Sequence, residues 1–396
     1  MAQLPERCDV LVAGAGPAGS AAATLLARGG LDVVLVDQHA FPRDKVCGDG
    51  LIPDAHRALR RLGLLDEVMA RAQPATHVGL VSPRAIRVDV PGALAVLPRR
   101  ELDEIVCRGA LRAGARLFAP VRFVAPLEEG GAVVGARLAG GEHEREIRCA
   151  WLVLASGAVP QALIAAGMAL RQRPSGVALR GYLKNDAMRA RIDKLEVVWH
   201  RAVVPGYGWI FPCRDGVFNV GVGAATDREI NLRVLLDAFT RIYPNARELV
   251  AGGQWLAPPK GAPLRTSLDG ARLSRPGLLV TGEAAGSTYA FTGEGIGKAL
   301  ETGMHAAEAL LHGGARRAAD AAVRADYEAR LAALKPRFAL YERANWVNRH
   351  PWLADLVLWR ATRSERVHRR IAGVLEETSN PGRLLTAGGL YRLFTE

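Results

Sequence analysis

The apolar residues near the N-terminus form short uninterrupted runs on either side of one helix-like segment. Val10–Ala13 and Val33–Val36 are continuous apolar runs of the length expected for strands buried in a parallel sheet. The small residues of Ser20–Arg28 between them predict a helix, and the second run ends at Asp37. We therefore predict a strand–helix–strand unit that ends in an acidic residue.

A glycine-rich turn, Gly14-Ala15-Gly16-Pro17-Ala18-Gly19, joins the first strand to the helix. Gly14 permits a tight turn, Gly16 lets the backbone approach a pyrophosphate, and Gly19 allows close packing of the helix on the sheet. The helix N-terminus favours phosphate because its N–H groups are unpaired and its dipole is positive. Asp37 is placed to accept hydrogen bonds from a ribose. This spacing predicts a dinucleotide-binding site.

Further along the chain, the pattern predicts a second group of strands and several helices. Strands are predicted at Thr76–Val90, in a meander over Val121–Cys149, at Trp151–Leu154 and across Ser175–Ala225. Helices are predicted at Pro53–Leu62, from Arg99 to Ala113, and from Gly293–Gly297 through Leu311. The glycine-rich stretch Phe41–Leu51 is too polar for a core element and is predicted as a loop.

Length and charge narrow the class of protein. The chain has 396 residues, which exceeds one ordinary core and favours two closely connected domains. Its net charge of +12 indicates an anionic partner: a phosphate-bearing cofactor, an acidic substrate or a membrane surface. Nucleic acid is not expected, because the arginines are spread out and no nucleic-acid motif is present. The scattered histidines show no metal-ligand spacing, so no metal site is predicted.

The cysteines and the uncharged stretches indicate a compartment. Five cysteines without a CxxC pair favour a reducing environment and no disulfide framework. Val10–Ala27 and Cys149–Leu170 carry no charge, but glycine and proline interrupt both, so neither is expected to span a membrane. Asp9 and the lack of a basic start argue against a signal peptide. We expect a cytoplasmic protein, either soluble or peripheral to the membrane.

Three segments resemble the geranylgeranyl reductase family of flavoproteins. Phe41–Leu51 reads FPRDKVCGDGL, which is similar to the family's FPRxKxCGDGL loop. Gly206–Gly223 contains GYGWIFP and then FNVGVG, similar to the family's GYGWIFP…VNVGVG segment. Leu278–Gly286 resembles the family's strand ending in GDAAG. The family belongs to the p-hydroxybenzoate hydroxylase-like fold group, which also contains flavin-dependent halogenases and hydroxylases.

The resemblance implies an α/β fold (α+β overall), with FAD as the cofactor and NADPH or NADH as candidate electron donors. A Rossmann-like FAD-binding βαβ domain would hold an inserted antiparallel sheet as substrate domain, followed by C-terminal helices. The implied boundaries are 1–75, 95–170 and 275–315 for the FAD domain, 76–94 and 171–274 for the substrate domain, and 316–396 for the helices. The implied cofactor contacts are Gly14, Gly16, Pro17, Ala18, Gly19, Asp37, Gln38, Arg43, Cys47, Gly48, Asp49, Gly50, Arg99, Ser156, Gly157, Gly282, Glu283, Gly293, Gly295 and Ile296.

The resemblance also implies catalytic roles for Cys47, Tyr207 and Trp209. Tyr207, Trp209 and Phe211 alternate, which places them on one face of a strand, and the family implies that this face lines a substrate pocket beside the flavin. A plain core face explains the same alternation. Cys47 is a candidate proton donor near the reacting carbon, with an inert thiol as the alternative. Arg99 would reach the cofactor, with a solvated arginine at a helix start as the alternative.

Two positions depart from the family pattern. Ser156 stands where relatives carry the aspartate of an Asp-Gly motif, which is tied to FAD and nicotinamide use. This departure weakens the case that NADPH or NADH reduces the flavin directly. Glu283 replaces the aspartate of GDAAG, so its carboxylate is one methylene longer. The cofactor prediction therefore rests on three segments together, and the electron donor stays open.

The leading functional hypothesis is an FAD-dependent oxidoreductase that reduces carbon–carbon double bonds of a prenyl or other hydrophobic substrate by hydride transfer from reduced flavin. The alternative is an FAD-dependent monooxygenase in a biosynthetic pathway, and a third is an accessory flavoprotein that acts with a protein partner. The tail at Lys335–Arg370 mixes tryptophan with arginine. That composition is typical of helices packed over a substrate domain and also of helices on a membrane surface.

Overall fold

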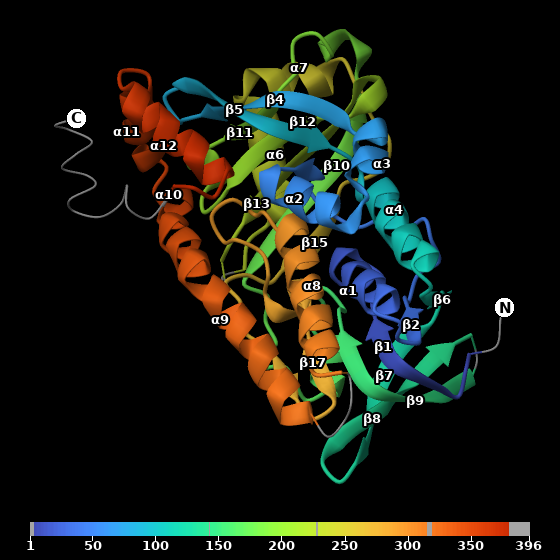
Figure 1. Cartoon of the computed structure of the whole chain (residues 1–396). Coiled ribbons are helices and arrows are strands. Elements are labelled where there is room, and N and C mark those ends of the chain that lie inside the picture. Colours follow the sequence, from blue (N-terminus) through green and yellow to red (C-terminus); the bar gives the residue numbers. More distant parts are fainter. Residues whose placement is uncertain (1–3, 142, 227–228, 315–318, 380–396) are drawn as a thin grey trace.

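The computed structural model describes residues 4–141, 143–226, 229–314 and 319–379, and two β-sheets organise them (Figure 1). The parts of the predicted domains at 1–3, 142, 227–228, 315–318 and 380–396 lie outside the described residues. In the described part of the chain, no helix combines the length and the apolar character needed to cross a membrane.

The first sheet contains the predicted strand–helix–strand unit. Its strand order is β16-β17-β9-β1-β2-β6, with β8 paired to β9 and β7 paired to β8. The five strands β17, β9, β1, β2 and β6 run parallel, and the apolar runs at its centre are buried on both faces. The bounds are β1 Arg7–Ala13, β2 Val33–Val36, β6 Arg116–Phe118, β7 Arg122–Glu129, β8 Ala132–Gly140, β9 His143–Leu154, β16 Ser274–Arg275 and β17 Leu278–Val280. The predicted α/β fold is confirmed, and β9 extends the strand predicted at Trp151–Leu154.

Helices α1 (Pro17–Arg28), α4 (Arg99–Arg112) and α8 (Ile296–His312) pack together on one side of this sheet (Figure 1). Helix α1 approaches α8 closely, because a Cβ on Gly303 would lie 2.1 Å from the carbonyl oxygen of Ala18. Small residues on α1 permit this contact, and it holds the N-termini of both helices near the sheet edge where the strands end. Both helices begin beside the cavity described below.

The second sheet is mainly antiparallel. Its strand order is β14-β10-β13-β12-β11-β4-β5-β3, with β15 paired to β10, and β11 with β4 is its one parallel pair among the described strands. The single strand predicted at Thr76–Val90 is wrong in detail, because a turn at 82–86 divides it into two. The bounds are β3 Gly50–Leu51, β4 Gln73–Val81, β5 Arg87–Val96, β10 Gly176–Lys184, β11 Leu195–Val198, β12 Tyr207–Pro212, β13 Val217–Ala224, β14 Gln254–Trp255 and β15 Lys260–Leu264.

Helices of the C-terminal part cover this second sheet. Helix α12 contacts β5, and α11 contacts β4 and β5 (Figure 1). Leu358, Val367 and Ile371 are buried against apolar residues of these strands. The inner face of the tail helices is therefore packed on the second sheet, as the packed-helix interpretation expected. The bounds are α9 Asp320–Ala344, α10 Trp346–Arg349, α11 Trp352–Ala361 and α12 Glu365–Leu375; the other helices are α2 Pro53–Leu62, α3 Leu65–Arg71, α5 Gln161–Ala165, α6 Leu232–Ile242 and α7 Pro244–Ala251.

Candidate active site

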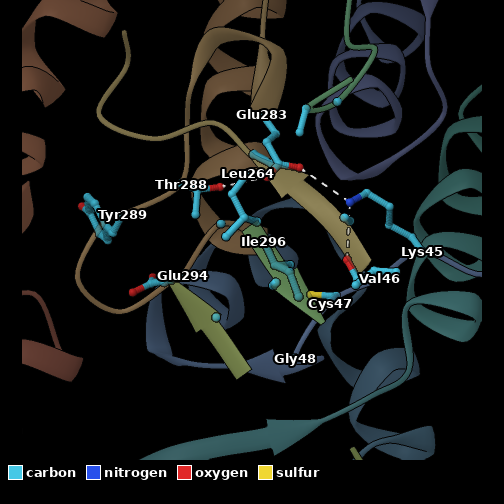
Figure 2. A pocket seen from close by; sticks show the side chains of 18 of the residues that line it. Lys45, Val46, Cys47, Gly48, Leu264, Glu283, Thr288, Tyr289, Glu294 and Ile296 are labelled. Atoms are coloured by element: carbon cyan, nitrogen blue, oxygen red, sulfur yellow. Dashed lines mark hydrogen bonds and ion pairs between the residues drawn. The ribbon is translucent and has the colours of Figure 1, made fainter. Parts of the chain in front are cut away.

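One cavity of about 770 Å³ is lined by residues of both sheets, and Figure 2 shows part of its wall. All of the predicted site residues line it except Gly19 and Gly282. These two glycines lie just behind the wall: a Cβ on Gly19 would be 1.8 Å from the carbonyl oxygen of Gly14, and one on Gly282 would be 2.5 Å from Cβ of Ala18. The fold thus brings residues from 14 to 296 around one space. Their individual roles remain predictions.

The glycine turn leaves a cradle at the N-terminus of α1. Gly14 has φ of 112°, and a Cβ there would lie 2.3 Å from the carbonyl oxygen of Ala155. Gly16 precedes the helix, and no side chain caps its N-terminus. A Cβ on Gly16 would meet only Arg43 and Arg99, at 3.5 and 3.9 Å. The free N–H groups and the two guanidinium groups fit the pyrophosphate of a dinucleotide.

One buried carboxylate holds both arginines at this cradle. Asp103 on α4 accepts two hydrogen bonds from Arg99, at 2.6 and 2.9 Å, and one from Arg43 at 2.9 Å. Asp103 is fully buried, so its charge needs both partners. The sequence predicted the two arginines as cofactor contacts, but it gave no role to Asp103. Its position one helical turn after Arg99 is the signal that was available.

Asp37 connects the end of β2 to the glycine turn. Its Oδ2 accepts from the Ala15 N–H at 3.0 Å, and its Oδ1 accepts from the His39 N–H at 3.0 Å. Arg43 Nε lies 3.4 Å from Asp37 Oδ1. Asp37 also lines the cavity, where a carboxylate can accept hydrogen bonds from a ribose. These three interactions inside the protein therefore keep the Asp37 carboxylate in place at the cavity wall.

The middle of the cavity presents polar atoms with few internal partners. Ser156 Oγ is buried without a hydrogen-bond partner among the described residues, and Gly157 beside it has φ of 76° with open space at its Cβ position. Lys45 Nζ lies 3.8 Å from Glu283 Oε2, and Thr288 donates to Glu283 Oε1 at 3.4 Å (Figure 2). An unpaired buried hydroxyl implies a ligand group, because such an atom is costly otherwise. These groups fit the central part of an FAD molecule.

The Cys47–Gly50 loop is anchored to the second sheet through Asp49. Asp49 Oδ2 accepts from Tyr182 Oη at 2.5 Å and from Asn219 Nδ2 at 2.7 Å, while its Oδ1 accepts from the Arg99 N–H at 3.2 Å. Burial raises the pKa of Asp49 to about 6, although Tyr182 opposes this shift. Asp49 has φ of 65°, a left-handed conformation that these three bonds maintain.

Cys47 lies inside the cavity wall with its sulfur toward the loop backbone. The Asp49 N–H donates to Cys47 Sγ at 3.4 Å, and burial raises the pKa of the Cys47 thiol. Asn219 Nδ2 donates to the Cys47 carbonyl oxygen at 2.8 Å, which fixes the backbone of this residue. The thiol form is therefore the one held at neutral pH. A neutral thiol can donate a proton, and its role stays a prediction.

The far part of the cavity is apolar. Tyr207, Trp209 and Phe211 all line it from β12, and Trp209 Nε1 donates to Asn219 Oδ1 at 2.9 Å. Phe211 packs over the glycine loop, because Cβ atoms on Gly48 and Gly50 would lie 3.2 and 3.3 Å from its ring. The alternation in sequence therefore produces one continuous aromatic wall.

The C-terminal helices close this apolar part. Side chains from α10, α11 and α12 line the cavity opposite the second sheet, among them Val347, Leu358 and Ile371. Sequence reasoning predicted that the tail packs on the substrate domain, but it did not predict these residues as pocket lining. The signal was the apolar spacing of Ala354 and Leu358 within the arginine-rich tail.

Comparison with known proteins identifies the family. Residues 7–200 match the FAD binding domain family. The chain is 35% identical to menaquinone reductase of Mycolicibacterium smegmatis over 332 residues, covering 78% of this chain and 77% of that protein. The chain belongs to the geranylgeranyl reductase family of FAD-dependent oxidoreductases. The predicted cofactor, FAD, and the predicted enzyme class are thereby confirmed.

One further relative by sequence and one solved structure are also similar to this chain. The digeranylgeranylglycerophospholipid reductase of Methanosarcina acetivorans is 29% identical over 316 residues, covering 76% of this chain and 74% of that protein. A solved structure of a geranylgeranyl bacteriochlorophyll reductase-like protein from Thermoplasma acidophilum has a TM-score of 0.75 at 22% identity, covering 99% of this chain and 96% of that one. This likeness shows that the two proteins share a fold.

Proposed function

We propose that this FAD-dependent oxidoreductase reduces carbon–carbon double bonds in a prenyl chain or a similar hydrophobic substrate. The observation that carries the proposal is the continuity of the cavity, which joins the dinucleotide cradle at Gly16 to an aromatic and aliphatic chamber. Such a chamber favours a chain without polar groups. The names of the relatives, menaquinone reductase and digeranylgeranylglycerophospholipid reductase, support a lipid substrate.

Bound, reduced FAD would supply a hydride. The protein would orient the substrate, exclude water from the cavity and supply a proton. The wall formed by Trp209 and Phe211 orients an extended chain by apolar contact. Leu358 and Ile371 of the C-terminal helices line the apolar part of the cavity and exclude water from it. Exclusion of water favours hydride transfer to carbon over side reactions. Asp103 and Asp37 both contact Arg43 and hold the residues of the cofactor cradle in place.

The test is the mass of the product formed from menaquinone with an unsaturated side chain. Reduced enzyme and menaquinone are mixed anaerobically, and the quinone ring is then chemically reoxidised before mass analysis. A product that stays heavier by two hydrogen atoms supports reduction of the side chain. A product that returns to the starting mass shows that only the ring was reduced. One added oxygen atom under aerobic conditions with labelled oxygen would instead establish the monooxygenase alternative.

We also propose that the outer face of the C-terminal helices rests on a membrane surface. Trp346, Trp352 and Trp359 have exposed fractions of 48%, 52% and 39%, unlike the buried residues of the same helices. Trp352 and Trp359 are seven residues apart on α11 and so lie on one face. Arg363 packs over the Trp359 ring, at 4.5 Å from its centroid. Exposed tryptophan with arginine is typical of binding to an anionic interface, from which a lipid substrate would reach the chamber.

A further inference from the structure

A buried cluster of ionisable groups lies beside the cavity and has no role in the cofactor cradle. One carboxylate oxygen from each of Asp54, Glu294 and Glu377 lies within 4.8 Å of the others. Lys298 lies among them, with Nζ 2.8 Å from Glu377 Oε1 and 3.7 Å from Asp54 Oδ2. The lysine ammonium already serves as the cation of this cluster. Of these groups, Glu294 lines the cavity (Figure 2).

Arg57 and Arg337 also pair with Glu377, whereas Asp54 pairs with Lys298, so a further carboxylate beside Asp54 needs a proton. Asp54 Oδ2 and Glu294 Oε1 are both buried without a hydrogen bond among the described residues. Two carboxylate oxygens can pair only when one of them carries a proton, because both are otherwise acceptors. Two like charges at this separation in a buried site cannot both persist. One proton is therefore shared between Asp54 and Glu294.

The environment places that proton on Glu294. Burial raises the pKa of Glu294 well above its ordinary value, and the Asp54 charge adds to this. Burial also raises the pKa of Asp54, but Lys298 and the Ala55 N–H, 2.5 Å from Asp54 Oδ1, favour its charged form. Despite burial, Lys298 lowers the pKa of Glu377, so that carboxylate stays charged.

Tyr207 joins the backbone next to Glu294 to the aromatic wall. Its hydroxyl donates to the Thr292 carbonyl oxygen at 2.5 Å and lies 2.7 Å from the Cβ position of Gly293, directly before Glu294. Burial raises the pKa of Tyr207, so the phenol is protonated. The tyrosine ring lines the chamber on the aromatic wall.

We propose that Glu294 is the proton source for reduction of the double bond, since it is the acid of this cluster that lines the cavity. This inference rests on the proposed function. A hydride from bound, reduced FAD would form one C–H bond, and the Glu294 proton would form the second as the π bond breaks. Glu294 would become a carboxylate near Lys298, and solvent would reprotonate it after product release. The cofactor would be left oxidised, and a nicotinamide or other two-electron donor would have to reduce it again.

The test compares Glu294→Gln with Glu301→Gln. Glu301 also pairs with Lys298, at 2.7 Å, but it does not line the cavity. Reduced holoenzyme is mixed anaerobically with menaquinone, and the rate of side-chain saturation is measured from pH 5 to 9. We expect Glu294→Gln to lower this rate at least 100-fold and Glu301→Gln to change it less than twofold. The wild-type rate should fall as pH rises and Glu294 ionises, and that fall should be absent in Glu294→Gln.

A second readout does not depend on turnover. Glutamine mimics the protonated acid, so Glu294→Gln should bind FAD normally and should lose the decrease in unfolding free energy that ionisation of Glu294 causes at high pH. The charged and titratable groups around this cluster are Asp54, Arg57, Tyr207, Tyr289, Lys298, Glu301, Arg337, Tyr341 and Glu377.

The outcomes separate the two proposals. A wild-type enzyme that saturates the side chain, with Glu294→Gln equally fast, would overturn the proton-source assignment and leave the proposed function standing. A wild-type enzyme that never saturates the side chain would overturn the proposed function itself. If the pH-dependent change in unfolding free energy is lost in Asp54→Asn and retained in Glu294→Gln, the proton resides on Asp54. That result would also contradict the assignment.

Discussion

Asn219 Nδ2 donates a hydrogen bond to Asp49 Oδ2 over 2.7 Å, joining the cavity-lining Cys47–Gly50 loop to the second sheet. The same side chain accepts from Trp209 Nε1 and donates to the Cys47 carbonyl oxygen. One asparagine therefore aligns a wall of the chamber with the loop that carries the candidate catalytic thiol.

Replacement of this asparagine should loosen both elements. We expect Asn219→Ala to lower the free energy of unfolding by about 3 kcal/mol, since it leaves the Trp209 indole N–H without a partner and removes one of the three hydrogen bonds to Asp49. FAD affinity should fall as well, measured by quenching of flavin fluorescence. Asn231→Ala is the control: it removes the N-cap of α6 and should cost about 1 kcal/mol without changing FAD affinity. An equal effect of both variants on FAD would contradict the linking role of Asn219.

Asp103 should control cofactor affinity through the two arginines that it holds. We expect Asp103→Asn to weaken FAD binding about tenfold, because it weakens the charge-assisted bonds that fix Arg43 and Arg99. The matched control is Glu104→Gln on the same helix, whose carboxylate pairs with Arg108 at the surface. Isothermal titration of the apoproteins with FAD measures both. Unchanged affinity in Asp103→Asn would show that the arginines do not need this carboxylate.

The two glycines of the turn should respond differently to the same substitution. Gly16→Ala meets only side-chain atoms at 3.5 Å or more, so the apoprotein should keep its stability while the methyl group enters the cofactor cradle and lowers FAD affinity. Gly14→Ala would place Cβ against the Ala155 carbonyl oxygen at positive φ, which should cost about 3 kcal/mol of stability. Thermal unfolding of both apoproteins, followed by FAD titration, distinguishes these effects. Normal FAD binding by Gly16→Ala would contradict the placement of the pyrophosphate at this turn.

Asp49 should give the protein a pH-dependent stability in the acidic range. Burial raises its folded-state pKa from 3.8 to about 6, so the folded protein binds the proton more tightly than the unfolded chain does. This contribution is complete below pH 4 and is lost as pH rises through 6, a change of about 3 kcal/mol. Asp49→Asn cannot ionise, so its unfolding free energy should fall less over this interval, as measured by urea denaturation. Parallel pH profiles for both proteins would contradict the assignment.

The exposed tryptophans should bind anionic vesicles. We expect Trp352→Ala with Trp359→Ala to reduce co-sedimentation with phosphatidylglycerol vesicles at least fivefold, while activity on detergent-solubilised substrate is retained. Leu170→Ala is the control, since this side chain is 63% exposed outside the C-terminal helices. Equal loss in both proteins, or none in the double variant, would show that this face does not meet a membrane.

Local patterns were sufficient to predict the elements around the glycine turn. The Gly14–Gly19 turn, the strand that ends before Asp37 and the helix from Pro53 to Leu62 all depend on residues close together in the chain, so composition and spacing determine them. The aromatic face of β12 follows from alternation alone.

The contacts that join distant segments could not be predicted in the same way. Asn219 and Asp49 are 170 residues apart, and nothing in either segment indicates that their side chains meet. Glu294 reads as part of a glycine-rich helix start, and only the fold places Asp54 and Glu377 around it. The division of the strand predicted at Thr76–Val90 has a partly related cause, because its turn is held by Ser82 and by the Arg84 N–H, which donates to Asp355 on α11.

The most direct test of the central claim is anaerobic rapid mixing of the reduced enzyme with menaquinone, followed by flavin absorbance and product mass. We expect flavin reoxidation at the same rate as the appearance of a side chain that carries two extra hydrogen atoms. Reoxidation that occurs only when oxygen is admitted, with an oxygen atom in the product, would contradict it and identify a monooxygenase.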